Sequence, residues 1–354
     1  MEREFIVVFG GTGTIGKHLV PLLCKKLASL NTDDNVQHVV CVITRNIRSA
    51  IEIFMNVGLI PLGSVQSSAN SFPIAPHVGL GFVEGSVEYP ELLEDTLHAA
   101  TRLFLLTQTS FGPRQRVVEE NILSLMNRED HPFVSLRHIV RISAHSRYMS
   151  GQPSNSPFRW HSECDDQLLQ WCAIAQASGR DVSVSVIRPS LFMQDMIRPH
   201  FAPVICRTDC FYQLGKLCNT GSVAAHGVYQ DLYRIAMVDV RDIAEVCACV
   251  LTESVHKHAG HTYLLCGPRA LSWGDVAAAI SSACGRPITA SMLSDRAFLD
   301  HFGGSHIYLK QMQAYRAGGG EDVDNDCEVV TGRPPRDITE FASDYVEAWR
   351  KDDV

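Results

Sequence analysis

The chain has 354 residues, of which 45% are hydrophobic and 20% are charged, so it can form a sizeable core and is not globally disordered. Its 31 basic and 39 acidic residues give a net charge of -8, and no basic run is present. This balance argues against nucleic acid or an anionic membrane surface as a partner. No apolar stretch reaches the roughly 18 residues of a membrane-spanning helix and no signal peptide is evident, so we expect a cytoplasmic protein.

The first half of the chain alternates short apolar runs with amphipathic segments. Buried strands are predicted at residues 5–9, 39–43, 81–83, 103–106, 138–142 and 182–187. Helices are predicted at residues 15–30, 117–126 and 161–178, and a further helix starts at Pro90. Apolar strands that alternate with helices form parallel sheets with both faces covered, so we expect an α/β fold with a doubly wound parallel sheet. Residues 61–76 and 147–157 are predicted to be irregular loops.

The pattern changes in the second half, where residues 190–234 show no clear period. A helix is predicted at 240–251 and a strand at 262–265. Ser272 is a plausible N-cap for a helix over 273–284, which Gly285 would end. A short strand near Ile288 and two helical stretches complete the expected elements.

Twelve cysteines are scattered along the chain, many inside apolar segments, and no Cys-x-x-Cys pair occurs. This pattern is typical of free thiols that pack as small hydrophobes in a reducing compartment. Cys206, Cys210 and Cys218 lie near two histidines in the sequence. Because their spacing fits no known ligand pattern, no metal site is expected.

The sharpest local signal is the run Gly-Gly-Thr-Gly-Thr-Ile-Gly at residues 10–16, directly after a predicted strand and before a predicted helix. In this context Gly10 permits a tight turn, Gly13 lets backbone N–H groups approach a pyrophosphate, and Gly16 lets helix and strand pack closely. The anion would lie at the positive end of the helix dipole. We therefore predict a Rossmann dinucleotide site that contains Gly10, Thr12, Gly13, Thr14, Ile15 and Gly16.

The end of the second predicted strand favours NADP(H) over NAD(H). NAD sites carry a carboxylate there, which accepts a hydrogen bond from the ribose 2′-hydroxyl. This chain has Thr44, Arg45 and Asn46 instead, and a guanidinium can pair with a 2′-phosphate. The alternative is that Arg45 is a solvated loop cation or stacks on the adenine.

Several motifs in order resemble the NmrA-like branch of the atypical short-chain dehydrogenases/reductases. They are the glycine turn, Ile-Arg-Pro-Ser-Leu-Phe-Met-Gln at 187–194, Val-Asp-Val-Arg-Asp-Ile-Ala at 238–244, Tyr-Leu-Leu-Cys-Gly-Pro at 263–268, and three glycines at 318–320 before Thr-Gly-Arg-Pro-Pro at 331–335. The resemblance implies an NAD(P)H-dependent reductase of quinones, imines or enones, similar to fungal alkaloid-pathway enzymes. The family that the chain resembles also includes redox sensors that bind NADP without turnover, and enzymes that isomerise or cyclise their substrates.

The catalytic residues are less plainly marked. Ordinary short-chain dehydrogenases use Tyr-x-x-x-Lys, but here Tyr148 is followed four residues later by Gln152. The matching pair Tyr212 and Lys216 follows the sixth predicted strand, so we attribute it to coincidence. The candidates are the residues around the fifth strand's end and the next helix: Ser143, His145, Tyr148, His161 and Asp165.

His161 and Asp165 are one turn apart at the predicted start of that helix and resemble the family's His-x-x-x-Glu-x-x-Leu, with Asp165 in the acidic place. The resemblance places His161 where related plant reductases carry a lysine. A histidine beside the nicotinamide can donate a proton or bind the cofactor ribose. The alternative is a structural histidine that is hydrogen-bonded to Asp165.

Other residues are expected to line the cofactor and substrate. Thr107 and Gln108 end the fourth predicted strand, beside the expected nicotinamide ribose, and are assigned to the cofactor. Phe192 and Met193 are assigned to an apolar substrate pocket. We expect residues 1–190 plus 235–268 to form the NADP-binding Rossmann domain, and residues 191–234 plus 269–354 a smaller substrate-binding lobe.

The resulting hypothesis is an NADP(H)-dependent oxidoreductase that reduces a hydrophobic small molecule carrying an imine, enone, quinone or ketone, in a biosynthetic pathway. The alternatives are a non-redox isomerase, epimerase or cyclase on the same fold, and an NADP(H)-sensing regulatory protein without turnover. A reactive iminium or quinone needs little acid catalysis, which is how a chain without the Tyr/Lys pair can still be a reductase.

Overall fold

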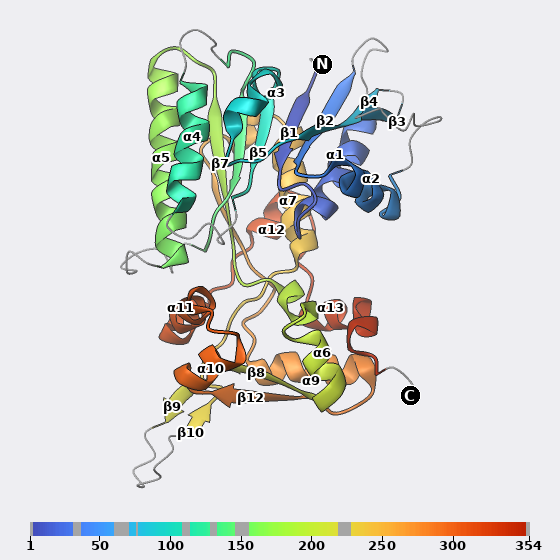
Figure 1. Ribbon diagram of the computed structural model, residues 1–354, viewed down its shortest axis with the longest axis vertical. Helices are drawn as coiled ribbons and strands as arrows, with labels where there is room; N and C mark the ends of the chain where they lie inside the picture. The colour runs from blue at the N-terminus through green and yellow to red at the C-terminus, as the bar shows by residue number, and fades with distance from the viewer. Residues whose placement is uncertain are drawn as a thin grey trace. The chain divides into compact units, whose positions relative to one another are not determined.

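The computed structural model describes residues 3–30, 37–59, 71–75, 77–107, 114–127, 133–145, 156–218 and 228–351 (Figure 1). Two compact units divide the chain. The first comprises Met1–Ser143, Trp160–Arg188 and Ile243–Tyr263, and the second comprises Ala144–Arg159, Pro189–Asp242 and Leu264–Val354. Among the described residues, no helix combines the length and the apolar character needed to cross a membrane.

An eight-stranded sheet with the order β11-β7-β6-β5-β1-β2-β4-β3 forms the framework of the first unit. Its strands are β1 (Phe5–Phe9), β2 (His38–Thr44), β3 (Ser71–Ala75), β4 (Val78–Glu84), β5 (Arg102–Leu105), β6 (His138–Ile142), β7 (Ser183–Pro189) and β11 (Thr262–Leu265). The pairs from β4 through β2, β1, β5 and β6 to β7 are parallel, and β3 is antiparallel to β4. The predicted α/β class with a mostly parallel sheet is therefore confirmed.

Helices connect these strands, because parallel neighbours need crossovers. They are α1 (Gly16–Ala28), α2 (Ile47–Asn56), α3 (Glu94–His98) after the 3₁₀ turn η1 (Pro90–Leu93), α4 (Gln115–Met126), α5 (Pro157–Ala177), α7 (Val240–Thr252) and α8 (Val255–His258). One face of the sheet packs against α4 and α5 through a core that includes Ile122, Leu168 and Trp171. Helix α1 contacts β1, β2 and β4, and α2 contacts β4.

The structure corrects three expectations in the first unit. Helix α5 begins at Pro157, a residue suited to the first turn of a helix, so His161 lies one turn inside rather than at the helix start. Strand β3 occupies part of the segment predicted to be an irregular loop. Helix α2 was not predicted, although Asn46 caps it by accepting a hydrogen bond from the backbone N–H of Ser49 at 2.9 Å.

The second unit contains the elements of residues 190–234, which show no clear period, and those of the C-terminal segment, where helices and a strand were expected. These are η4 (Met193–Ile197), α6 (Ala202–Thr208), β8 (Cys210–Leu214), β9 (Lys216–Cys218), β10 (Val228–Gln230), α9 (Trp273–Cys284), β12 (Thr289–Leu293), α10 (Asp295–His301), α11 (His306–Ala314), η5 (Tyr315–Gly319), α12 (Asp326–Thr331), α13 (Ile338–Asp344) and η6 (Val346–Trp349). Strand β12 pairs in parallel with β8, and β10 pairs antiparallel with β9. Helix α9 matches its prediction, with a Ser272–Asp275 capping box and a left-handed Gly285 at its end.

The cysteines pack as predicted. Free thiols are buried at Cys24, Cys41, Cys164, Cys172, Cys247, Cys249, Cys266 and Cys327. Burial raises the pKa of Cys24 and of Cys41 to about 12. These two side chains therefore stay protonated at neutral pH and act as small apolar residues.

Candidate functional site

The glycine turn joins β1 to α1 at the carboxyl edge of the sheet. Gly10 adopts a left-handed conformation with φ +70°, and its carbonyl accepts from the backbone N–H of Gly13 at 2.9 Å. A Cβ added at Gly16 would overlap the backbone of Gly10 and Gly11. The turn thus needs glycine at both ends, first for its backbone angle and then for close packing of the helix.

The N-terminus of α1 is open to an anion. The helix has no side-chain N-cap and no acidic residue in its first turn. None of the described residues accepts a hydrogen bond from the backbone N–H groups of Thr12, Thr14 or Ile15. Gly13 is exposed between them. Free N–H groups at the positive end of a helix dipole fit a phosphate.

Arg45 directly follows the carboxyl end of β2, the strand next to β1. It follows Thr44, the last residue of β2, and its side chain is exposed. Strand β2 pairs with β1 up to the register Phe9↔Ile43, so Arg45 and the glycine turn follow the same edge of the sheet. Within the described part of the chain, Arg45 has no ion-pair partner, which leaves its guanidinium available to a phosphate.

A buried polar cluster lies at the ends of β5, β6 and β7, on the other side of β1. We call it the Arg141 network, and its members come from these strands or the one or two residues after them and from helices α4 and α5. They are Thr107, Gln115, Glu119, Arg141, Ser143, His161, Asp165 and Arg188.

Arg141 is fully buried in β6 and is neutralised by two carboxylates. It donates to both oxygens of Glu119, at 2.8 Å from Nε and 3.0 Å from Nη2, and its Nη1 donates to Asp165. Burial would raise the pKa of Glu119, but the guanidinium of Arg141 lowers it overall. Burial likewise opposes the charge of Arg141, but the two carboxylates hold its pKa above the usual range. The network therefore holds its charges as ion pairs.

Asp165 is engaged on both oxygens. Besides Arg141, it accepts from the hydroxyl of Ser143 at 2.8 Å and from Nη2 of Arg188 at 2.9 Å. The predicted alternative partner of Asp165, His161, instead bonds to Gln115, whose Nε2 lies 3.2 Å from the imidazole Nδ1. Burial, followed by the charge of Arg141, lowers the pKa of His161 to about 3, so the ring is neutral at physiological pH.

The structure brings four of the predicted site residues together, namely Thr107, Ser143, His161 and Asp165. The other predicted residues are placed differently. In the second unit, His145 is buried, Phe192 is half-buried, and Met193 is fully buried within the hydrophobic core. Gln108 and Tyr148 lie outside the described residues.

Sequence reasoning missed Gln115, Glu119 and Arg141. One signal was present, since Arg141 interrupts the otherwise apolar run of β6. A charge inside a buried strand requires a carboxylate partner. The partner itself could not be identified from spacing, because Glu119 and Asp165 lie on different helices.

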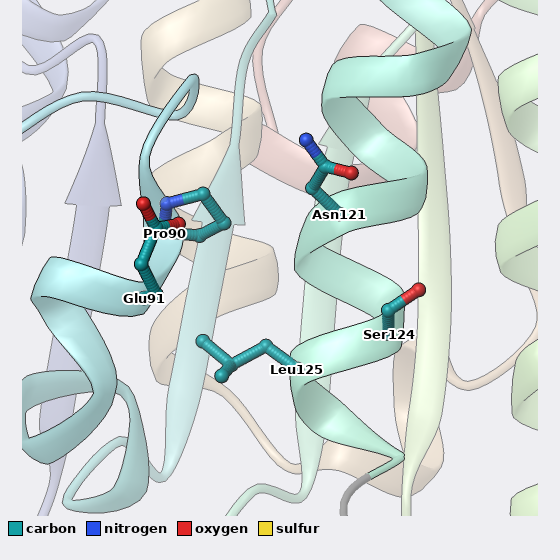
Figure 2. A pocket seen from close by; sticks show the side chains of 5 residues that line it. All are labelled: Pro90, Glu91, Asn121, Ser124 and Leu125. Carbon is teal, nitrogen blue, oxygen red and sulfur yellow. The ribbon is translucent and has the colours of Figure 1, made fainter.

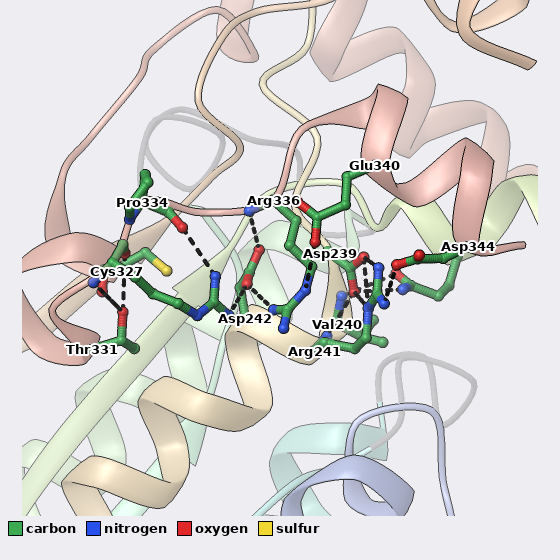
Figure 3. Close-up of polar contacts among 12 residues, drawn as sticks. Asp239, Val240, Arg241, Asp242, Cys327, Thr331, Pro334, Arg336, Glu340 and Asp344 are labelled. Atoms are coloured by element: carbon green, nitrogen blue, oxygen red, sulfur yellow. Dashed lines mark hydrogen bonds and ion pairs between the residues drawn. The ribbon is translucent and has the colours of Figure 1, made fainter. Parts of the chain in front are cut away.

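Three of the motifs that carry the family resemblance meet in the second unit, and Figure 3 shows labelled residues of two of them, at 238–244 and 331–335. The three motifs contribute Gln194, Asp239, Arg241, Asp242 and Arg333; Arg336 directly follows the last of these motifs, and α13 adds Asp344. Gln194 donates to Asp239 at 2.7 Å and accepts from the N–H of Val240, and Asp242 accepts from Arg333 and from Arg336. These seven residues form what we call the Asp239–Asp242 cluster, whose contacts join segments of the second unit to one another.

A separate pocket of about 390 Å³ lies between η1 and α4 in the first unit (Figure 2). Its lining residues are Pro90, Glu91, Asn121, Ser124 and Leu125. None of them belongs to the glycine turn or to the Arg141 network, so this pocket is not part of the candidate site.

Comparison with known proteins finds relatives over all or about half of the chain. The NAD(P)H azoreductase of Xenophilus azovorans is 24% identical over 359 residues, which cover 97% of this chain and 99% of the azoreductase. Agroclavine dehydrogenase of Claviceps purpurea is 26% identical over 179 residues, 48% of this chain and 57% of that enzyme. No family model matches the sequence.

Solved structures share the fold. The NADPH-dependent quinone oxidoreductase of Escherichia coli, complexed with NADPH, has a TM-score of 0.68 at 16% identity and covers 96% of this chain and 99% of its own. NmrA, a negative transcriptional regulator in complex with NADP, has a TM-score of 0.61 at 12% identity and covers 98% and 96%. The expected cofactor is thus the one that these neighbours hold.

The fold and the glycine turn define a Rossmann-type protein of the kind found in NAD(P)-binding reductases and epimerases. The relatives and structural neighbours to which the chain is similar include NmrA-like atypical short-chain dehydrogenases/reductases, the family that its motifs resemble.

Proposed function

We propose that the chain is an NADPH-dependent reductase of a hydrophobic small molecule that carries an imine, enone, quinone or ketone. The proposal is supported by two features that lie at the carboxyl edge of the first unit's sheet. The open glycine turn follows β1, and the Arg141 network follows β5 and β6. The strand order reverses between β1 and β5, and dinucleotides bind at such switch points. We place the reaction in small-molecule biosynthesis, as the resemblance to alkaloid-pathway reductases implies.

The residues of this edge fit the cofactor. The free N–H groups of Thr12, Thr14 and Ile15 would hold the pyrophosphate, and the exposed guanidinium of Arg45 would pair with the 2′-phosphate. Thr107 lies two residues after β5, the strand beside β1, where the nicotinamide ribose is expected. When bound, NADPH supplies the hydride, and the reduction is completed by one proton from solvent.

The network residues have different roles in this proposal. We assign contact with the acceptor molecule to His161, because its imidazole is neutral and its Nε2 bonds to none of the described residues. Ser143 and Asp165 are positioning residues, since their polar atoms already bond within the network. The roles predicted for His145, Tyr148, Phe192 and Met193 stay predictions.

The test is NADPH oxidation, followed by near-ultraviolet absorbance, with a panel of quinones, imines, enones and ketones. NADPH binding is measured separately by calorimetry on the same preparation. We expect tight NADPH binding and turnover with at least one class of acceptor. Tight binding without any turnover would identify a sensor, and product formed without loss of NADPH would identify an isomerase or cyclase. Either result would overturn the proposal.

A further inference from the structure

We propose that the Arg141 network fixes the single ring proton of His161 on Nε2, so that His161 presents a neutral N–H donor to an acceptor with a lone pair at the reacting group. Such acceptors are carbonyl oxygens, as in quinones, enones and ketones, and unprotonated imine nitrogens. An iminium cation, which has no lone pair, is not recognised in this way. The choice of acceptor rests on the proposed function, whereas the position of the proton rests on contacts within the first unit alone.

The first step is the ionisation of Glu119. Arg141 donates to both of its oxygens, and a guanidinium cannot accept a hydrogen bond or give up its proton at neutral pH. Glu119 is therefore a carboxylate, which accepts hydrogen bonds and donates none. Its pKa is lowered by the same guanidinium.

The second step is the direction of the Thr107 hydroxyl. Its Oγ1 is in hydrogen-bond contact with Oε1 of Glu119, and Gln115 Nε2 lies 2.9 Å from the same Oγ1. A hydroxyl has one proton. Because Glu119 can only accept, the proton of Thr107 is directed to Glu119, and Thr107 must accept from Gln115. This fixes the orientation of the Gln115 amide, with its nitrogen toward Thr107.

The third step is the imidazole. The second N–H of the Gln115 amide points to Nδ1 of His161 at 3.2 Å, so Nδ1 must accept. An accepting Nδ1 carries no proton, and the neutral ring then holds its proton on Nε2. The carbonyl oxygen of Gln115 is buried and bonds to none of the described residues, so it does not determine the orientation of the amide.

The surrounding charges keep the ring neutral. Within the first unit, His161 faces Arg141 from β6 and Glu119 from α4, and Asp165 lies one turn further along its own helix. Both carboxylates are already paired with arginines. The charge of Glu119 favours a protonated imidazole, but burial and the charge of Arg141 outweigh it. Burial and Arg141 both favour the neutral form. A neutral imidazole acts as a hydrogen-bond donor to developing negative charge rather than as an acid.

The proton position is tested by ¹⁵N NMR of the full chain labelled at histidine. The His161 signals are assigned from their loss in His161→Gln. We expect one neutral state with Nε2 protonated and Nδ1 bare, unchanged between pH 5 and pH 8. If the ring of the wild-type protein is protonated on Nδ1, or titrates within this range, the proposal is overturned without recourse to any further variant.

A matched pair of variants tests the route through Thr107. Thr107→Ser keeps the hydroxyl and should keep the wild-type His161 signals. Thr107→Val is similar in shape but has no hydroxyl, so the Gln115 amide loses its fixed orientation and the His161 signals should shift toward those of exchanging tautomers. Unchanged signals in Thr107→Val would contradict the relay.

The choice of acceptor is tested by comparing an enone or quinone with a preformed iminium salt. His161→Leu removes the donor, and His161→Gln retains an amide N–H near the position of Nε2. We expect kcat/KM for the carbonyl acceptor to fall about 100-fold in His161→Leu and to recover in part in His161→Gln, with little change for the iminium. Equal losses for both acceptors would overturn this part. If no acceptor turns over, the proposed function fails, while the NMR result still decides the proton position.

Discussion

The Arg141 network of the first unit and the Asp239–Asp242 cluster of the second are both built from arginines and carboxylates, but they differ at their ends. In the second cluster, each carboxylate accepts hydrogen bonds from arginine or amide groups, and these contacts hold segments of that unit together. The first network ends in an uncharged imidazole whose Nε2 bonds to none of the described residues. The motifs that resemble the family therefore mark the structural cluster, whereas the residues suited to chemistry are brought together by the fold.

The largest expected effect is from Arg141→Met, which leaves two buried carboxylates without their common partner. We expect a loss of about 3–5 kcal/mol in the free energy of unfolding, measured by urea denaturation. The double variant Arg141→Met with Glu119→Gln should recover part of this loss, because one uncompensated charge is removed. Additive losses in the double variant would contradict the ion-pair interpretation.

A smaller loss is expected from Asp242→Ala in the second unit. Its partners Arg333 and Arg336 are partly exposed, so solvent can hydrate them once the carboxylate is gone. We expect a loss of about 1.5–3 kcal/mol in the free energy of unfolding. NADPH affinity, measured by calorimetry, should be unchanged, since this cluster has no proposed role in binding. A loss of NADPH affinity would show that the two clusters are not separable by function.

Arg45→Ala tests the cofactor edge without a cost in stability, because the side chain is exposed. We expect NADPH affinity to fall about 10–100-fold through loss of a charge-assisted contact with the 2′-phosphate. NADH affinity should stay the same. The NADPH affinity of Arg45→Lys should lie between those of the wild type and of Arg45→Ala. If affinities for NADPH and NADH decline together, Arg45 stacks on the adenine instead.

The smallest effect is the response of the two units to acid. Burial lowers the pKa of His138 in the first unit to about 3, so it stays neutral when folded. A folded pKa below the unfolded value of about 6.5 means that stability falls as the pH drops below 6.5, by up to about 1.4 kcal/mol per pH unit. The pKa of Asp239 in the second unit is also lowered, because Arg241 outweighs the effect of burial. Its contribution is lost only below the usual aspartate range.

Hydrogen exchange followed by mass spectrometry separates these two responses. Between pH 6.5 and pH 5.5, after correction for intrinsic exchange rates, peptides of the first unit should lose protection before those of the second. The variant His138→Asn should reduce the response of the first unit. Simultaneous loss in both units would mean that the chain unfolds as one cooperative body.

Much of the first unit follows from its sequence because short apolar runs and a glycine turn are local signals. The predicted bounds of strand β6 and of helix α9, including its Ser272 cap, match those in the structure. The antiparallel strand β3 was not predicted, because its sequence contains Pro73, which argues against a strand. The elements around β8 were not predicted, because β8 pairs with β12, which lies far along the chain.

The candidate site divides in the same way. The glycine turn is contiguous and could be recognised, as could Arg45 at the end of β2. Gln115 and Glu119 could not, because an ordinary polar helix residue has no signature until the fold buries it against Arg141. His161 was a candidate, but its contact with Gln115 could not be predicted, because the two residues lie on different helices.

The uncapped start of α1 has a consequence for the stability of the protein. Without a side-chain cap, the first turn leaves backbone N–H groups that only water or an anion can satisfy. Under the proposed function, the pyrophosphate takes the place of that cap, so the ligand completes a secondary-structure element. The thermal midpoint should then rise with NADPH concentration, and amides near Gly13 should exchange faster in the ligand-free protein.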